Sequence, residues 1–396
     1  MKYGLVVLSV FLFSDGLWAQ DEADPLGLSG KWNNGLEFKT NDGSASVKLG
    51  GRVMLDNVFF SDDTGQEDGT EFRRTRLMLS GKVNNFEWKT QYDFARGDDS
   101  GGTDKGKRPA FKDVYVGLGG VPYAGALRAG HFKEPFGLEE LTSSKYITFM
   151  ERSLTSAFAP SRNVGVMAHR TLESGTLAYG VFRTTGDNGF DTGDGDYSLT
   201  GRYTRLINTE GGSLIHLGGA LSTRSLQGNL SLEPRASSHL GPKAVEGTVA
   251  GADGEFRYGV EAAYVNGSFS LQGEFMGSSV SADDNVSYTG WYVMGSYFLT
   301  GESRPYDSKR GIFKRVKPAK EFAWGESWGA TELAARYGSV NYSDFTDGVT
   351  LDDLTVGVNI YHNPVFRTMI NYVYSDMGGG GAEAMHAFMM RWQIGM

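Results

Sequence analysis

Residues 384–396 read Ala-Met-His-Ala-Phe-Met-Met-Arg-Trp-Gln-Ile-Gly-Met, and this stretch decides the fold class. Apolar side chains recur at every second position, at Phe388, Met390, Trp392, Ile394 and Met396. Successive side chains of a strand point to opposite faces, so the face that carries Arg391 and Gln393 is the more polar one. This pattern is typical of a membrane strand, although a soluble β-sandwich has similar strands. The same pattern recurs along the chain, after an N-terminal leader, and this favours membrane strands over a soluble sandwich.

The leader is residues 1–19, which have the pattern of a secretory signal peptide. Lys2 precedes a short apolar run, and Ala19 precedes an acidic start at Asp21. The run has about nine residues, whereas an α-helical membrane span needs about 20. We therefore interpret residues 1–19 as a signal peptide, 20–44 as a short periplasmic segment and 45–396 as a transmembrane β-barrel.

Alternation of apolar and polar residues recurs in sixteen segments. The clearest are 47–60, 86–95, 258–265, 269–275 and 354–360, and the others begin near residues 72, 111, 126, 164, 177, 197, 214, 288, 332, 365 and 384. Open sheet edges cannot lie in lipid, and a bacterial barrel has an even number of strands. The sequence therefore predicts an all-β fold, a 16-stranded antiparallel transmembrane β-barrel with in-folded loops.

Composition agrees with a barrel around a wet bore. The 396 residues include 56 glycines, no cysteine and 13% aromatics, at a mean hydropathy of -0.32. The absence of cysteine excludes a disulfide scaffold and thiol catalysis. The formal net charge of -9 argues against nucleic acid as a partner.

Connection lengths give a second indication of the topology. Short turns are expected on the periplasmic side, at 84–85, 119–123, 172–175, 208–212, 266–267 and 363–364. The outer loops between them are longer or acidic, with Asp62, Asp63, Glu67, Asp68, Asp187, Asp191, Asp194 and Asp196. We expect these outer acids to share divalent cations with lipopolysaccharide.

Three long connections are expected to do more than close the barrel. The outer loops 132–162 and 225–254 are expected to fold inward, the first because it is rich in apolar residues. The seventh periplasmic connection, 300–327, holds seven basic residues against one acid between Arg304 and Lys320. It either hangs in the periplasm or tucks into the bore, and its aromatics, Tyr306, Phe313, Phe322 and Trp324, favour tucking.

Several strings resemble the phosphate-selective porin O/P family from about Gly35 to the end of the chain. They are Phe72-Arg73-Arg74-Thr75-Arg76-Leu77, Tyr92-Asp93-Phe94-Ala95, Gly130-His131-Phe132-Lys133-Glu134-Pro135-Phe136-Gly137-Leu138-Glu139-Glu140, Thr142-Ser143-Ser144-Lys145, Phe149-Met150-Glu151-Arg152, Leu299-Thr300-Gly301-Glu302, Arg304-Pro305-Tyr306-Asp307 and Val316-Lys317-Pro318. The resemblance implies a trimeric outer-membrane channel of sixteen strands, whose in-folded loops narrow a pore for small anions.

The resemblance also implies where anions bind at the constriction. By motif position the family's anion site falls on Arg73 or Arg74, with Arg76 in the same motif, and on Asp93 and Lys133. One departure concerns the fifth-loop region, where the family's phosphate channels have closely spaced arginines. Here that region offers only Arg224, Arg235 and Lys243, so the anion is left open between phosphate and other oxyanions.

The charge pattern points to anions without the family. Strand parity assigns twelve basic residues to the bore, Lys48, Arg52, Arg74, Arg76, Lys89, Arg128, Arg202, Arg224, Arg257, Arg336, Arg367 and Arg391. It assigns eight acids, Asp56, Glu87, Asp93, Asp113, Glu261, Glu274, Glu332 and Asp353, which leaves an excess of four positive charges. The 300–327 turn adds pore-lining Lys309, Arg310, Lys314 and Arg315. Rings of Arg and Lys are typical of anion pores. Alternatively, individual arginines pair with these acids and only brace the wall.

Other functions have weaker support. Residues 325–329 match the hydrolase pattern Gly-x-Ser-x-Gly, but a strand rather than the required helix is expected after them. No spacing indicates a metal site, and no cofactor is expected. The sequence therefore predicts a passive, anion-selective channel of the bacterial outer membrane, not an enzyme. The alternatives are a general-diffusion porin of little selectivity and a barrel enzyme of the lipase or protease type.

Overall fold

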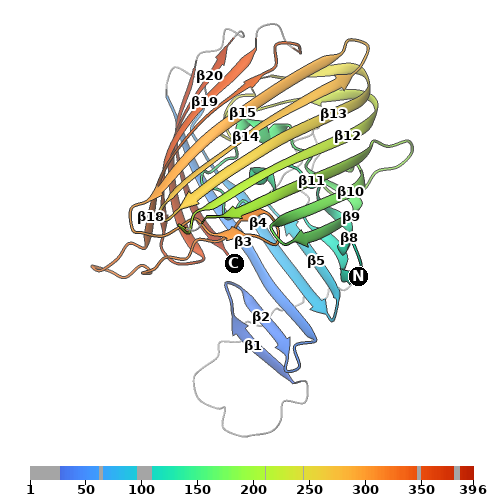
Figure 1. Ribbon diagram of the computed structural model, residues 1–396. Coiled ribbons are helices and arrows are strands. Elements are labelled where there is room, and N and C mark those ends of the chain that lie inside the picture. The colour runs from blue at the N-terminus through green and yellow to red at the C-terminus, as the bar shows by residue number, and fades with distance from the viewer. Residues whose placement is uncertain are drawn as a thin grey trace, which may run out of the picture.

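In the computed structural model the chain folds as a closed antiparallel β-barrel (Figure 1). The structure describes residues 27–61, 66–95, 109–209, 211–243, 245–345, 349–378 and 384–396. Sixteen barrel strands in these ranges confirm the sequence prediction. The barrel closes where the last strand, β21, pairs with the first, β3, in a register that matches Arg391 with Asp56. The signal peptide, Asp62 and Asp63 lie outside the described residues.

The barrel strands follow one another around the ring in chain order. They are β3 (Ala45–Phe60), β4 (Gly69–Val83), β5 (Phe86–Asp93), β7 (Val114–Val121), β8 (Gly125–Lys133), β9 (Arg162–Leu172), β10 (Gly175–Arg183), β11 (Tyr197–Asn208), β12 (Leu214–Leu232), β13 (Gly247–Asn266), β14 (Phe269–Ser281), β15 (Val286–Phe298), β18 (Ala330–Asn341), β19 (Thr350–Tyr361), β20 (Phe366–Gly378) and β21 (Met385–Gly395). A two-residue strand, β6 (Ala110–Phe111), also pairs with β5. Each expected short turn falls between two of these strands.

Side-chain alternation separates the two faces of the wall. On β21, Trp392 and Ile394 are exposed on the outside, whereas Arg391 and Gln393 are buried on the inside. β13 behaves in the same way, with Val260 exposed and Glu261 buried. The apolar face therefore meets lipid and the charged face lines the bore, as expected for a membrane barrel. Among the described residues, no helix is long and apolar enough to cross a membrane.

The described part of the segment before the barrel forms a hairpin. β1 (Leu28–Trp32) pairs with β2 (Leu36–Thr40), and β2 pairs with the start of β3, where Leu36 lies opposite Leu49. Figure 1 shows this hairpin below the barrel, continuing the wall from β3. It extends the barrel wall at the end that carries the short turns.

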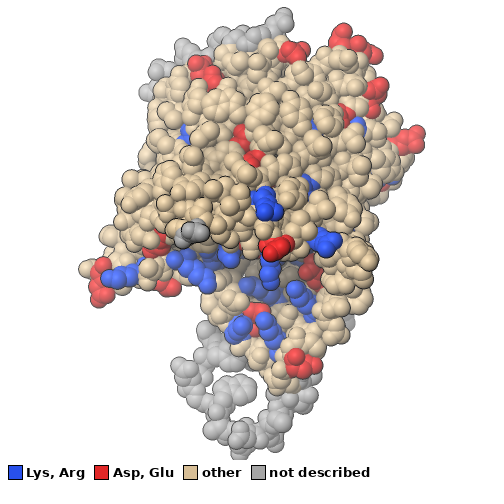
Figure 2. All heavy atoms as spheres, viewed as in Figure 1, with Lys and Arg blue, Asp and Glu red and all other residues tan. Residues whose placement is uncertain are grey.

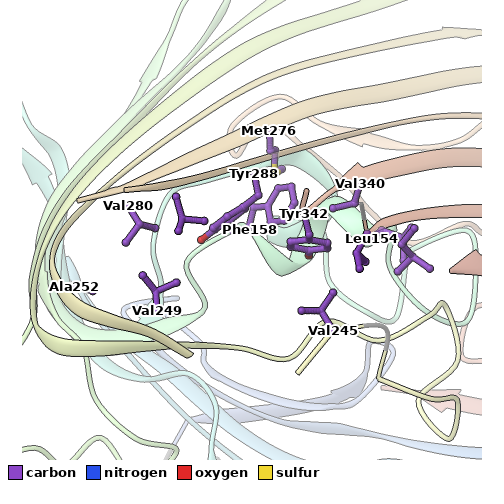
Figure 3. Packing of buried hydrophobic residues seen from close by; sticks show 14 of the residues in the cluster. Leu154, Phe158, Val245, Val249, Ala252, Met276, Val280, Tyr288, Val340 and Tyr342 are labelled. Carbon is purple, nitrogen blue, oxygen red and sulfur yellow. The ribbon is translucent and has the colours of Figure 1, made fainter. Parts of the chain in front are cut away.

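The connection between β8 and β9, residues 134–161, folds into the barrel, and we call it the inner loop. It contains α1 (Leu138–Leu141) and a 3-10 turn, η2 (Leu154–Ala157). Its apolar side chains are buried against the inner wall, and the Phe158 ring lies 5.0 Å from Tyr288 and 5.8 Å from Tyr342 (Figure 3). The apolar composition of this loop is thus explained by an apolar patch on the inner wall.

The second expected in-folded loop is shorter than the sequence indicated. Much of 225–254 is strand, because β12 continues to Leu232 and β13 starts at Gly247. Only 233–246 connects them. Register shifts between Ser225 and Gly228 and between Gly228 and Leu230 interrupt the alternation, and a bulge changes which face each side chain takes. The strand pattern is therefore hidden in the sequence at this point.

The long connection between β15 and β18, residues 299–329, divides into two parts, and we call it the basic turn. Its first part forms a small hairpin of β16 (Tyr306–Asp307) and β17 (Ile312–Phe313), with Arg304 and Phe313 buried. Its last part, residues 321–329, is the tip and exposes Trp324 and Trp328. The prediction that the aromatic residues of this turn fold into the bore is therefore right for Tyr306 and Phe313, which contact each other. It is wrong for Trp324, which is exposed.

We expect Phe158→Ala to loosen the inner loop. Removing a buried ring that packs on two tyrosines costs roughly 3 kcal/mol of unfolding free energy, and a looser loop narrows the bore less. Single-channel recording should show a larger and noisier conductance, and the temperature of heat-induced gel mobility change should fall. Phe190→Ala, at an exposed outer-loop position, is the control and should change neither. Unchanged conductance in Phe158→Ala would contradict the packing role.

Candidate functional site

A β-bulge in β4 turns two adjacent arginines toward the bore. Met54 pairs with Arg74 but the next residue, Leu55, pairs with Phe72, so that Arg73 is the extra residue in the strand. In a regular strand, neighbours point to opposite faces, whereas a bulge breaks this rule locally. Arg73 and Arg74 therefore both reach the inner loop.

Glu151 of the inner loop receives these arginines. Arg73 Nε donates to its carboxylate at 2.8 Å, and Arg391 Nη2 from β21 at 3.0 Å, while Arg74 Nη2 lies 3.9 Å away. Burial alone raises the pKa of the Glu151 carboxyl, but Arg73, Arg74 and Arg391 together lower it well below its usual range. Three guanidinium groups around one carboxylate make an oxyanion-binding geometry, here filled by the protein's own side chain.

The other residues expected at the constriction are also paired with acids. Arg76 Nε donates to Asp93 at 2.7 Å, and Lys133 Nζ lies 2.5 Å from Glu140. Lys89 pairs with an acid too, at 2.5 Å from Asp113. These contacts agree with the alternative that such cations pair with acids and brace the wall, because a carboxylate neutralises each of them.

In the described part of the chain, several bore cations have no such partner, among them Lys48, Arg304 and Arg367. Three others lie close together, and we call them the basic cluster: Arg52 on β3, Lys145 in the inner loop and Arg315 in the basic turn. Among the described residues none pairs with an Asp or Glu. Arg52 Nη1 donates to Ser144 at 2.5 Å, and its Nε is buried without a hydrogen-bond partner in the described part of the chain. Lys145 donates to an oxygen of Met396, the last residue of the sequence, at 2.6 Å, and the Gly395 carbonyl accepts from Arg315 at 2.6 Å.

Tyr146 brings the basic cluster together. The Lys145 ammonium lies 5.5 Å and the Arg315 guanidinium carbon 5.4 Å from the centre of its ring, within cation–π range. Burial, and next the positive charges of Arg52 and Arg315, lower the pKa of Lys145. Like charges held this close, without an Asp or Glu side chain of the described residues between them, form a site that an anion stabilises.

The remaining expected bore residues lie at different depths. Lys48 donates to the Asn33 carbonyl of the N-terminal hairpin at 2.7 Å. Arg128 lies 4.0 Å from the Tyr115 ring centre and 3.2 Å from Glu87. In the basic turn, Lys309, Arg310 and Lys314 are exposed.

Figure 2 shows how charge is distributed between the two ends of the barrel. Basic side chains gather in the hollow below the wall in this view, and acidic ones mark the opposite rim. The acids of the described outer loops that are exposed include Glu67, Asp68, Asp187, Asp191 and Asp194. The net negative charge of the chain is therefore compatible with a positive passage.

Sequence reasoning missed several residues of this site. Glu140, Lys145, Glu151, Arg152 and Arg162 all lie on the inner loop or at its end, and the sequence motifs contain the first four without assigning them a role. Arg162 shares Asp113 with Lys89, at 2.8 Å. A usable signal was present, because charged residues recur inside a loop that is otherwise apolar.

Two buried charged residues of the wall, Glu274 and Arg336, hold the inner loop in place. Glu274 on β14 accepts the main-chain N–H groups of Leu138 and Glu139, each at 2.8 Å. Arg336 lies 3.6 Å from Glu139 and donates to the Glu151 carbonyl at 3.0 Å. The position of the loop, and with it the position of Glu151 and Lys145, is therefore fixed from both sides.

A closed sixteen-stranded barrel with an apolar outer face and a charged bore is a bacterial outer-membrane channel of the porin type. The chain belongs to the phosphate-selective porin O and P family, whose model matches residues 47–391. It is 28% identical over 390 residues to Porin O of Pseudomonas aeruginosa, covering 87% of this chain and 86% of that protein. Family and fold together indicate passive diffusion of anions through the channel rather than catalysis.

Solved structures support the fold. OmpT of Vibrio cholerae, an outer membrane protein in trimer form, matches at a TM-score of 0.56 and 13% identity, over 89% of this chain and 100% of that one. The outer membrane channel DcaP of Acinetobacter baumannii matches at 0.55 and 13%, over 91% and 99%. OprB of Pseudomonas putida matches at 0.58 and 10%, over 90% and 95%.

We expect Glu151→Gln to increase anion selectivity. The amide keeps the shape of the side chain but frees Arg73 and Arg74 from a fixed counter-charge, and one unit charge at about 4 Å is worth about 1 kcal/mol in water. The anion-to-cation permeability ratio, from zero-current potentials in a potassium chloride gradient, should rise about fivefold. Glu246→Gln, exposed in an outer loop, serves as the control. An unchanged ratio would mean that the arginines do not face the passing ion.

Proposed function

We propose that the channel selects small oxyanions such as phosphate, and that the basic cluster is its main selective site, with Arg73, Arg74, Arg76 and Lys133 contributing to the positive field of the bore. The observation that carries this proposal is that Arg52, Lys145 and Arg315 converge without an Asp or Glu partner among the described residues. Arg76, by contrast, is neutralised by Asp93. Arg367 also lacks an acidic partner among the described residues, but it donates to the Ile147 carbonyl at 3.0 Å.

The donor types of the cluster suit an oxyanion. A guanidinium presents paired planar donors, and an ammonium acts as a compact point charge, so together they match the several oxygens of phosphate. Arg52 Nε has no partner among the described residues, and it offers one such donor. The Ser144 hydroxyl, 2.5 Å from Arg52, adds a neutral donor at the same place.

The outer half of the bore contributes less. Arg224 is paired with Glu134 at 3.0 Å, and Lys243 with Glu233 at 2.8 Å. Arg235 donates to the Gly241 carbonyl at 3.0 Å. In the fifth-loop region only the exposed Arg235 thus lacks an acidic partner among the described residues, whereas three such cations lie together deeper, at the basic cluster.

We infer that the channel is a homotrimer. OmpT of Vibrio cholerae has been solved in a trimer form, and its fold matches. A membrane strand tilted by about 45° needs about 9–11 residues to cross the bilayer, whereas β5 and β7 have 8 each. This low part of the wall is covered better by another subunit than by lipid. We also propose that residues 1–19 are removed as a signal peptide, and that the outer acids share divalent cations with lipopolysaccharide.

The proposal is tested with Arg52→Gln combined with Lys145→Gln. Phosphate added to the bath should block chloride current through the unmodified channel, and the double variant should need about tenfold more phosphate for half block, because charge-assisted hydrogen bonds worth about 1.5 kcal/mol are lost. Sulfate and gluconate, measured in the same way, rank the anions.

Lys243→Gln is the matched control, since it removes a positive charge that outer-loop acids already neutralise. It should leave the half-blocking concentration unchanged. Equal block of the double variant and the unmodified channel would remove the basic cluster from the selective site. Failure of every anion to block the unmodified channel would instead favour a general-diffusion porin.

A further inference from the structure

A string of aromatic rings runs from the tip of the basic turn to the outer wall of the barrel. Within the tip, Phe322 lies 5.0 Å from Trp324 and 5.7 Å from Trp328, measured between ring centres. Phe322 also contacts His362 at 5.7 Å, and His362 contacts Phe366 at 5.3 Å. Phe366 then reaches Trp392, at 6.5 Å, whose side chain lies on the lipid-facing side of β21.

The two tryptophan rings of the tip are exposed, although a protein in water usually buries such large apolar surfaces. Trp324 is 83% exposed and Trp328 is 64% exposed. The tip is nevertheless ordered by its own main chain, since Ala323 and Ser327 form a bridge and Phe322 N–H donates to the His362 carbonyl at 2.7 Å. The rings are therefore presented outward by a defined turn.

The tip also points in the right direction to meet the membrane. Figure 1 shows the connection into β18 projecting sideways from the lower end of the barrel, away from the bore. This end carries the short turns and is the periplasmic end. Lys317, Lys320 and Glu326 are exposed along this part of the turn. Figure 2 shows basic and acidic side chains at the end of the projection.

We propose that the tip, residues 321–329, lies in the headgroup region of the inner leaflet of the outer membrane, with Trp324 and Trp328 as its anchors. Tryptophan is enriched at membrane–water interfaces because its ring is amphipathic, and barrels carry such aromatic girdles at both rims. The string from Trp392 to Trp324 continues the girdle of the wall onto the tip. Lys317 and Lys320 place their ammonium groups among the phosphates, as long basic side chains do at interfaces.

The anchor has a consequence for the bore. The same basic turn places Arg304 and Arg315 inside the barrel, where Arg304 donates to Gln272 at 2.8 Å. With one part of the turn held in the bore and the other in the lipid interface, its hairpin stays fixed at the periplasmic mouth. The inference rests on the outer-membrane location and is independent of which anion passes.

The test uses the absence of cysteine in the chain. Trp324→Cys and Trp328→Cys are labelled separately with an environment-sensitive fluorophore, and the protein is reconstituted in phosphatidylethanolamine–phosphatidylglycerol vesicles. A phospholipid spin-labelled near the glycerol end of its acyl chain should quench both labels about threefold more than a label at Trp32→Cys. Trp32 is a matched reference because it is 63% exposed on the N-terminal hairpin. Phe388→Cys, on the lipid-facing wall, is the positive reference.

Both exposed tryptophans can be replaced without opening the core, so folding is not expected to obscure the result. Quenching by aqueous iodide with no lipid quenching, as at position 32, would place the tip in the periplasm and overturn the proposal. Quenching by neither reagent would indicate a protein contact and would overturn it as well.

Discussion

The structure depends on one constraint, that a backbone group in lipid has no water to bond with and must find its partner inside the protein. The sixteen strands meet this requirement only because β21 returns to β3 and leaves no edge. Arg391 and Asp56 lie at this seam, joined at 2.6 Å across almost the full length of the chain. Closure then fixes the alternation of faces, which sends apolar residues to the lipid and charges to the bore.

Charges in the bore follow a second constraint, that a poorly hydrated charge needs a counter-charge. The inner loop supplies many of them, with Glu140 facing Lys133 and Glu151 facing Arg73. Among the cations left without an Asp or Glu partner in the described residues, Arg52, Lys145 and Arg315 lie close together, around Tyr146 and Ser144. Selectivity in this channel is thus assigned to the cations left over after pairing, not to the total number of cations.

Local pattern predicted the strands well, and long-range contacts explain what it missed. The alternation at 384–396 and in its fifteen counterparts placed the strands and their short turns, because each strand carries its two faces in its own sequence. The bulge at Arg73 interrupts the alternation of faces in β4, and the alternation pattern of the sequence does not reveal it. The pairing of Glu151 with Arg391 joins residues 240 positions apart, and no local pattern records it. The division of the basic turn likewise depends on the pocket that receives Phe313 and the lipid that Trp324 meets.

The zero-current potential of the unmodified channel in a tenfold potassium chloride gradient tests the central claim most directly. A passage lined by uncompensated cations should shift this potential toward the equilibrium potential of chloride, and more so at low salt, where charges are screened less. A potential near zero, or one displaced toward the equilibrium potential of potassium, would contradict it.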